Sequence, residues 1–140
     1  MRLRRFRLTQ IGIGFWLILC ALWCLFGYQS KVAAGKAFGN MTYLTTYPNI
    51  AEKVTLVNGW YKWSERSKEG FFSYYGLYYE GHYVYGDFNR DGLNDAAAVI
   101  SEGEGGSGDF RALAFLIHDG TRLVHRQSVA LGDRVVIRAR

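Results

Sequence analysis

The hydrophobic positions of this chain follow two different patterns. Residues 8–30 contain no charged side chain and are rich in leucine, isoleucine and tryptophan. After residue 40 the apolar and aromatic residues instead form short runs that are separated by glycine-containing turns. A run of about 20 apolar residues is typical of a single hydrophobic helix, whereas short runs at a spacing of about 8–12 residues are typical of antiparallel strands. The pattern therefore predicts one N-terminal hydrophobic helix followed by a β-rich domain.

The β-rich part consists of strand-forming runs bounded by turn signals. Asn58-Gly59, between two such runs, predicts a two-residue hairpin turn, because both residue types tolerate a positive φ. Glu80-Gly81 predicts a further turn between two aromatic runs. We therefore expect a mainly β fold, either a small antiparallel sheet, a sandwich or a partial barrel. The predicted strands cover residues 41–47, 53–57, 60–63, 71–79, 82–88, 95–100, 110–117, 121–131 and 134–137.

The N-terminal apolar segment indicates where the protein is located. Arginines at positions 2, 4, 5 and 7 precede it, and such flanking positive charge predicts an N-terminus on the cytoplasmic side. The length of the segment predicts an uncleaved membrane anchor through residues 8–30. The alternative is a cleaved signal peptide, with Val32 and Ala34 at the small-residue positions before Gly35. We expect either a single-pass inner-membrane protein of the bacterial cell envelope, with a periplasmic or extracellular C-terminal domain, or a protein secreted after cleavage near Ala34.

The predicted domain organisation follows from these segments. Residues 1–30 form the anchor or signal peptide, residues 31–40 form a short polar linker, and residues 41–140 form one β-rich extracytoplasmic domain. The sequence ends at Arg140 within a predicted strand. Either this strand is internal to the sheet, or the domain is truncated at its C-terminus, because a ragged strand end would leave an exposed pairing edge.

Charge and cysteine placement exclude two classes of function. The formal net charge is +5, but the four N-terminal arginines account for most of it, and no Lys/Arg cluster follows residue 40. We therefore expect no nucleic-acid binding. Cys20 and Cys24 both lie in the apolar segment, so the β-rich domain contains neither a disulfide nor a Cys-ligated metal.

One acidic loop suggests a specific chemistry. The segment from Asp87 to Asp95 has the form D-x-N-x-D-G-x-x-D, in which alternate side chains turn toward one centre and Gly92 allows a sharp turn. Oxygen ligands that include three carboxylates suit a hard cation, Ca²⁺ first. The alternative is that the Asp and Asn side chains only cap backbone groups in a tight turn. The predicted calcium ligands are Asp87, Asn89, Asp91, Leu93 (through its carbonyl) and Asp95.

Two resemblances involve this loop. Residues 86–100 resemble the strand–loop–strand calcium motif of FG-GAP and VCBS repeats. A single copy excludes a propeller, and Ala98 at the twelfth loop position, where an EF-hand requires Glu, excludes an EF-hand. Residues 85–134, with YGDFNRDGLNDAAAVI, GGSGDFRALAFLI and LGDR, resemble a family of uncharacterised bacterial envelope proteins. That resemblance implies a small secreted or anchored β-rich domain and no particular activity.

The remaining candidate residues have ordinary structural explanations. Tyr and Trp are dense between Tyr43 and Phe88; such side chains can stack on sugar rings, but they are also favoured in strands and in cross-strand packing. Glu102 and Glu104 are typical of a solvated glycine-rich turn. The histidines show no metal-ligand spacing, and no set of nucleophile, base and oxyanion donors is recognisable.

We therefore expect a non-enzymatic envelope module, with or without a stabilising calcium ion. The alternative function is a carbohydrate- or peptidoglycan-binding module that uses the Tyr- and Trp-rich strands. The expected partners are the membrane, through residues 8–30, and an envelope glycan or protein. The sequence does not indicate an oligomeric state.

Overall fold

The computed structural model describes residues 19–26, 33, 35–46 and 51–138. The chain divides into two compact units, Met1–Ala34 and Gly35–Arg140, and each is described by itself. In the first unit residues 19–26 are helical and their side chains are exposed. The rest of the predicted apolar helix, residues 8–18 and 27–30, lies outside the described residues.

The structure contradicts the prediction of a membrane anchor. Within the described residues, no helix is both long enough and apolar enough to cross a membrane. The prediction of a single-pass inner-membrane protein of the cell envelope, anchored through residues 8–30, is therefore contradicted. The cleavage position near Ala34 lies outside the described residues.

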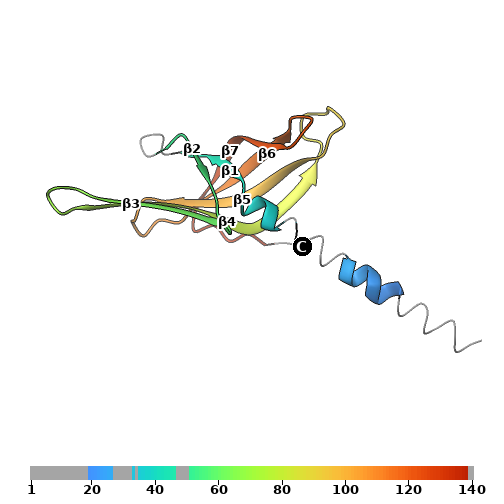
Figure 1. Cartoon of the computed structure of the whole chain (residues 1–140), viewed down its shortest axis with the longest axis horizontal. Helices are drawn as coiled ribbons and strands as arrows, with labels where there is room; N and C mark the ends of the chain where they lie inside the picture. Colours follow the sequence, from blue (N-terminus) through green and yellow to red (C-terminus); the bar gives the residue numbers. More distant parts are fainter. Residues whose placement is uncertain (1–18, 27–32, 34, 47–50, 139–140) are drawn as a thin grey trace, which may run out of the picture. The chain divides into compact units, whose positions relative to one another are not determined.

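The second unit is mainly β, which confirms the predicted fold class (Figure 1). A small antiparallel sheet pairs β1 with β2, and a larger antiparallel sheet has the strand order β3-β4-β5-β6-β7. Each strand of the larger sheet pairs with the next strand along the chain, so this sheet is a meander with β3 and β7 at its edges. The strands are β1 (Thr42–Leu44), β2 (Lys53–Thr55), β3 (Trp60–Arg66), β4 (Phe72–Gly86), β5 (Asp95–Gly103), β6 (Phe110–His118) and β7 (Leu123–Asp133).

The core lies between the β1–β2 hairpin and one face of the larger sheet, which we call the core face. Tyr43 and Val54 of the hairpin are buried, and the ring of Tyr43 lies 5.4 Å from that of His125 on β7. The sheet turns mostly small or aliphatic side chains toward the hairpin, so the two can pack closely. These buried residues are Leu77 on β4, Ala96, Ala98 and Ile100 on β5, and Ala112, Ala114 and Leu116 on β6.

The opposite face of the larger sheet, which we call the open face, carries the alternate residues that point away from the hairpin. They include Trp60 on β3, Tyr78 on β4 and Ser101 on β5, which are cross-strand neighbours. The centre of this face is buried by its own side chains, whereas Val84 on β4 and Val129 on β7 are exposed. One face of the sheet is therefore accessible to a ligand.

Local turn signals predicted the connections only in part. The turn at Asn58-Gly59 is confirmed, with both residues at positive φ. It closes only an isolated bridge between Val57 and Trp60, and the strands on either side, β2 and β3, belong to different sheets. The turn predicted at Glu80-Gly81 is wrong, because residues 72–86 form the single strand β4 and Gly81, at a φ of 79°, lies in a bulge where the pairing with β5 shifts. Residues 134–137 form no strand, since Arg134, at a φ of 52°, turns the chain out of the ladder.

Candidate functional site

The acidic loop connects β4 to β5. The carboxylate at its end, that of Asp95, accepts hydrogen bonds from backbone N–H groups through both of its oxygens. Asp95 is buried. One of its oxygens accepts hydrogen bonds from the N–H groups of Phe88, at 2.9 Å, and Asn89, at 3.4 Å, and the other accepts from His118 N–H at 2.8 Å. These bonds, that from His118 above all, favour the ionised form and lower the pKa of Asp95. Asp95 therefore fastens the loop to the end of β6.

The other predicted ligands cap the backbone of the loop itself. Asp87 accepts hydrogen bonds from the N–H groups of Asp91 and Gly92, at 3.1 and 3.0 Å. Asp91 accepts from Leu93 N–H at 2.8 Å and from the side-chain amide of Asn89 at 2.7 Å. The structure thus gathers these side chains into one exposed turn, in which they satisfy backbone donors.

The side chains predicted to bind calcium take part in the hydrogen bonds of this loop. Asn89 turns its amide nitrogen, a donor, toward Asp91, and Asp95 uses both oxygens on backbone N–H groups. Among the described residues, no group of three or more acidic, histidine or cysteine side chains is arranged to hold a metal. Nothing in the described residues supports a calcium-binding function, and the calcium site stays a prediction from the sequence.

The aromatic residues divide between the two faces of the larger sheet. Tyr75 is fully buried on the core face, where Phe38, from the helical turn at residues 35–38, lies 5.9 Å from the ring of Tyr79. Trp60 and Tyr78 instead lie directly opposite each other on the open face. Core packing therefore accounts for only part of the aromatic content.

Four residues of the open face form a cluster that we call the aromatic platform: Trp60, Lys62, Tyr74 and Tyr78. Strand pairing places all four on the same face. The hydroxyl oxygens of Tyr74 and Tyr78 are 2.6 Å apart. The Lys62 ammonium lies 5.3 Å from the ring centroid of Trp60 and 6.0 Å from that of Tyr78. Trp60 keeps 48% of its surface exposed, so its ring is available for stacking.

Gly76 lies beneath the aromatic platform, opposite Lys62. A Cβ at this position would lie 2.8 Å from Cε2 of Tyr78 and 3.0 Å from the hydroxyl oxygens of both Tyr74 and Tyr78. The two tyrosines therefore lean toward each other over the glycine. Burial, together with the hydrogen bond to Tyr74, raises the pKa of Tyr78 to about 12, so its hydroxyl remains protonated at neutral pH.

Ordered polar side chains border the aromatic platform, and we call Glu80, Ser101, Asp109 and Arg111 the polar row. The Ser101 hydroxyl donates to Glu80 at 2.7 Å. The Arg111 guanidinium lies 3.6 Å from the Glu80 carboxylate and 3.1 Å from that of Asp109. Ser101 lies directly opposite Tyr78 on one side and Arg111 on the other, so the polar row adjoins the aromatic surface.

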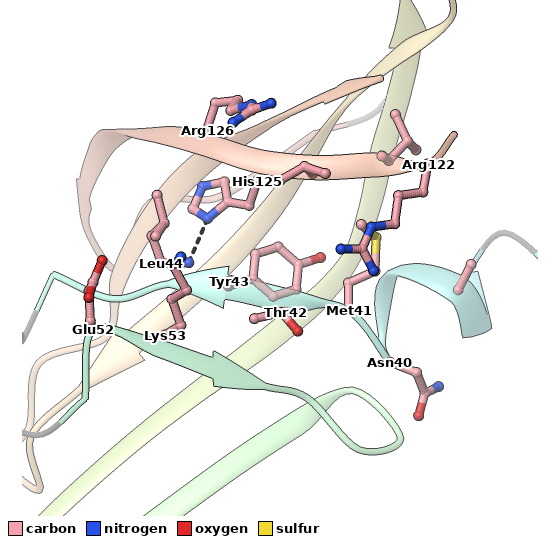
Figure 2. A pocket seen from close by; sticks show the side chains of 13 residues that line it. Asn40, Met41, Thr42, Tyr43, Leu44, Glu52, Lys53, Arg122, His125 and Arg126 are labelled. Atoms are coloured by element: carbon pink, nitrogen blue, oxygen red, sulfur yellow. Dashed lines mark hydrogen bonds between the residues drawn. The ribbon is translucent and has the colours of Figure 1, made fainter. Parts of the chain in front are cut away.

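Besides the aromatic platform, a groove between β1 and β7 can take a ligand (Figure 2). The N–H of Leu44 donates to Nδ1 of His125 at 2.8 Å and so joins the two strands. Nε2 of His125 lies 2.9 Å from the carbonyl of Gln127, which can only accept, so the proton is on Nε2 and the ring is neutral. Burial holds the pKa of His125 below its ordinary value.

Glu102 is a buried residue whose role the sequence did not indicate. It was predicted to lie in a solvated turn, and that prediction is wrong, because β5 continues to Gly103 and carries Glu102 onto the core face. Its carboxylate accepts hydrogen bonds from the Tyr75 hydroxyl at 2.8 Å, from Thr46 N–H at 3.3 Å and from the Thr46 hydroxyl. The period-two spacing from Ile100 to Glu102 is the signal that indicates this position.

Among the residues that the structure describes, the aromatic platform with its polar row and the groove between β1 and β7 are both open to a ligand. The likeness of residues 86–100 to FG-GAP and VCBS repeats stays a prediction from the sequence. No protein-family model, curated protein or solved structure matches this chain, so the assignment of a function has to rest on these surfaces.

Proposed function

We propose that this protein binds oligosaccharides on the aromatic platform. The observation that carries the proposal is the half-exposed ring of Trp60 beside Tyr74 and Tyr78 on the open face. An aromatic ring presents an apolar surface with a negative face, which suits the C–H groups on the flat side of a sugar. Rings on two adjacent strands can contact consecutive sugars of one oligosaccharide.

The polar row supports the same class of ligand. Sugar hydroxyls both donate and accept hydrogen bonds, so a site for them needs donors and acceptors beside the apolar surface. Glu80 supplies an acceptor and Arg111 supplies donors, while the buried Ser101 holds the Glu80 carboxylate in place. Because their mutual contacts already hold these side chains, little rotamer entropy remains to be lost on binding.

Lys62 adds a charged donor at the centre of the aromatic platform. Its contact with the Trp60 ring is an exposed cation–π interaction, worth about 0.5–1 kcal/mol. This energy is small enough for the ammonium to leave the ring and bind an acetamido or carboxylate oxygen. The platform therefore favours N-acetylated amino sugars and acidic sugars over glucans, which carry neither group.

Calorimetric titration of the full-length protein tests the proposal. Chitohexaose and soluble peptidoglycan glycan strands are the probes, and cellohexaose, which has neither acetamido nor carboxylate groups, is the comparison. We expect Trp60→Ala to weaken binding at least about tenfold, which corresponds to about 1.4 kcal/mol.

Phe110→Ala is the matched control, because Phe110 is 51% exposed but lies opposite Glu102 on the other face of the sheet. This variant should bind as the parent protein does. The proposal fails if none of the three saccharides binds at millimolar concentration, or if Phe110→Ala weakens binding as much as Trp60→Ala.

A further inference from the structure

The groove between β1 and β7 has the shape of a site for an extended chain. Its volume is about 710 Å³, within the range of about 300–1,000 Å³ that is common for ligand sites. One wall is β7, the edge strand of the larger sheet, and the other is β1, which belongs to the smaller sheet and pairs only with β2. Both walls are thus strand edges, and they do not pair with each other.

Within the described residues, the β7 wall presents backbone groups with which no strand pairs. The carbonyl of Arg122 accepts a hydrogen bond from Asp119 N–H at 3.0 Å, across the turn from β6. In an antiparallel ladder alternate residues direct both their N–H and C=O groups to the same neighbour. Arg122 and Val124 therefore face β6, and the intervening residues Leu123 and His125 direct their backbone groups into the groove.

Side chains of the larger sheet already bond to two N–H groups on the β1 side of the groove. Leu44 N–H is bonded to His125 Nδ1, and Thr46 N–H is bonded to the Glu102 carboxylate. What β1 offers to the groove is mainly side-chain surface, including that of Met41. An incoming strand would therefore pair with β7 and pack its side chains against β1.

The groove carries an excess of positive charge. Lys53, Arg122 and Arg126 line it together with a single acid, Glu52. Within the described part of the chain, none of the three cations forms a salt bridge. Figure 2 shows Arg122 reaching from the start of β7 toward Met41. Basic side chains on an edge strand discourage pairing with unselected strands, and they attract an acidic one.

We propose that an extended acidic segment of a partner protein binds in this groove by adding a strand to β7. The backbone of the segment pairs with Leu123 and His125, and its carboxylates lie against Arg122 and Arg126. Main-chain hydrogen bonds supply affinity in this mode of recognition, and side chains supply selectivity. The site shares no residue with the aromatic platform, so the two proposals stand or fall separately.

Fluorescence anisotropy with the full-length protein tests charge selectivity. The probe is a fluorescein-labelled peptide of five Glu-Val repeats, and its counterpart has five Lys-Val repeats. We expect the Glu-Val peptide to bind and the Lys-Val peptide not to bind. Arg122→Glu with Arg126→Glu should weaken binding at least about tenfold, whereas Arg66→Glu with Lys68→Glu, the same change of charge at the exposed β3–β4 turn, should leave it unchanged.

Peptide methylation tests strand addition itself. One peptide carries N-methyl groups on its valine residues and another carries them on its glutamate residues. Only one alternate set of amides faces β7 in a ladder, so one methylated peptide should lose binding and the other should keep it. Equal behaviour of the two methylated peptides overturns the proposal, as does an equal effect of the two double variants or a failure of the Glu-Val peptide to bind.

Discussion

Glu102 joins the β1–β2 hairpin to the larger sheet, and Glu102→Gln measures the strength of that connection. The residue is only 6% exposed, and its two oxygens accept three hydrogen bonds, one from Tyr75 and two from Thr46. The substitution keeps the shape and lets an amide donate to the Thr46 hydroxyl, but it removes the negative charge, so all three hydrogen bonds become neutral ones. Because a hydrogen bond to a charged group contributes about 1.5–3 kcal/mol, we expect the free energy of unfolding to fall by about that amount.

Urea denaturation of the full-length protein, followed by circular dichroism, measures this free energy at an unchanged m-value. Glu104→Gln is the control, because Glu104 is exposed just beyond the end of β5, and its effect should be within about 0.5 kcal/mol. Tyr75→Phe removes one donor alone. In a double-mutant cycle with Glu102→Gln, we expect a coupling energy of at least about 1 kcal/mol. Additive effects of the two substitutions, or equal effects of Glu102→Gln and Glu104→Gln, would refute the reasoning.

Three further predictions concern other parts of the structure. Burial lowers the pKa of His125 from 6.5, so its contribution to stability is complete above pH 6.5 and is lost as the pH falls through the lowered pKa; thermal melts between pH 8 and 5 should show this loss, and His82→Gln, at an exposed site, should not alter it. Asp95→Asn should lower the melting temperature more than Asp91→Ala, because Asp95 joins the loop to β6, and neither millimolar calcium nor a chelator should shift the melt of the parent protein. Gly76→Ala should displace the tyrosines above it and weaken oligosaccharide binding at least about tenfold with little change in melting temperature.

Features that depend on neighbouring residues were predictable from the sequence. The Asn58-Gly59 turn follows from the tolerance of both residues for positive φ, and both adopt it. The apolar runs at 95–100 and 110–117 correspond to β5 and β6, with small differences at their ends. In each case the information lies within one run of residues or one turn.

Features that depend on pairing between distant segments were not predictable. Gly81 has the sequence context of a turn, but the pairing of β4 with β5 on both sides of it makes it a bulge. The acidic loop shows the same limit, because its spacing suits either a cation or a set of N–H donors. The decisive donor for Asp95 is the N–H of His118, which another strand supplies.

Contacts between distant segments also decide which aromatic residues lie in the core and which belong to the aromatic platform. This division separates the residues that stabilise the fold from those proposed to bind a ligand. On β3 both faces carry aromatic residues, Trp60 on one and Tyr61 and Trp63 on the other, so the strand alone does not show which face is covered. The hairpin decides this by packing on the core face, where Glu102 and His125 hold it. A variant that loosens the hairpin, such as Glu102→Gln, should therefore lower the free energy of unfolding and leave the oligosaccharide affinity of the folded protein unchanged, because the aromatic platform lies on the opposite face.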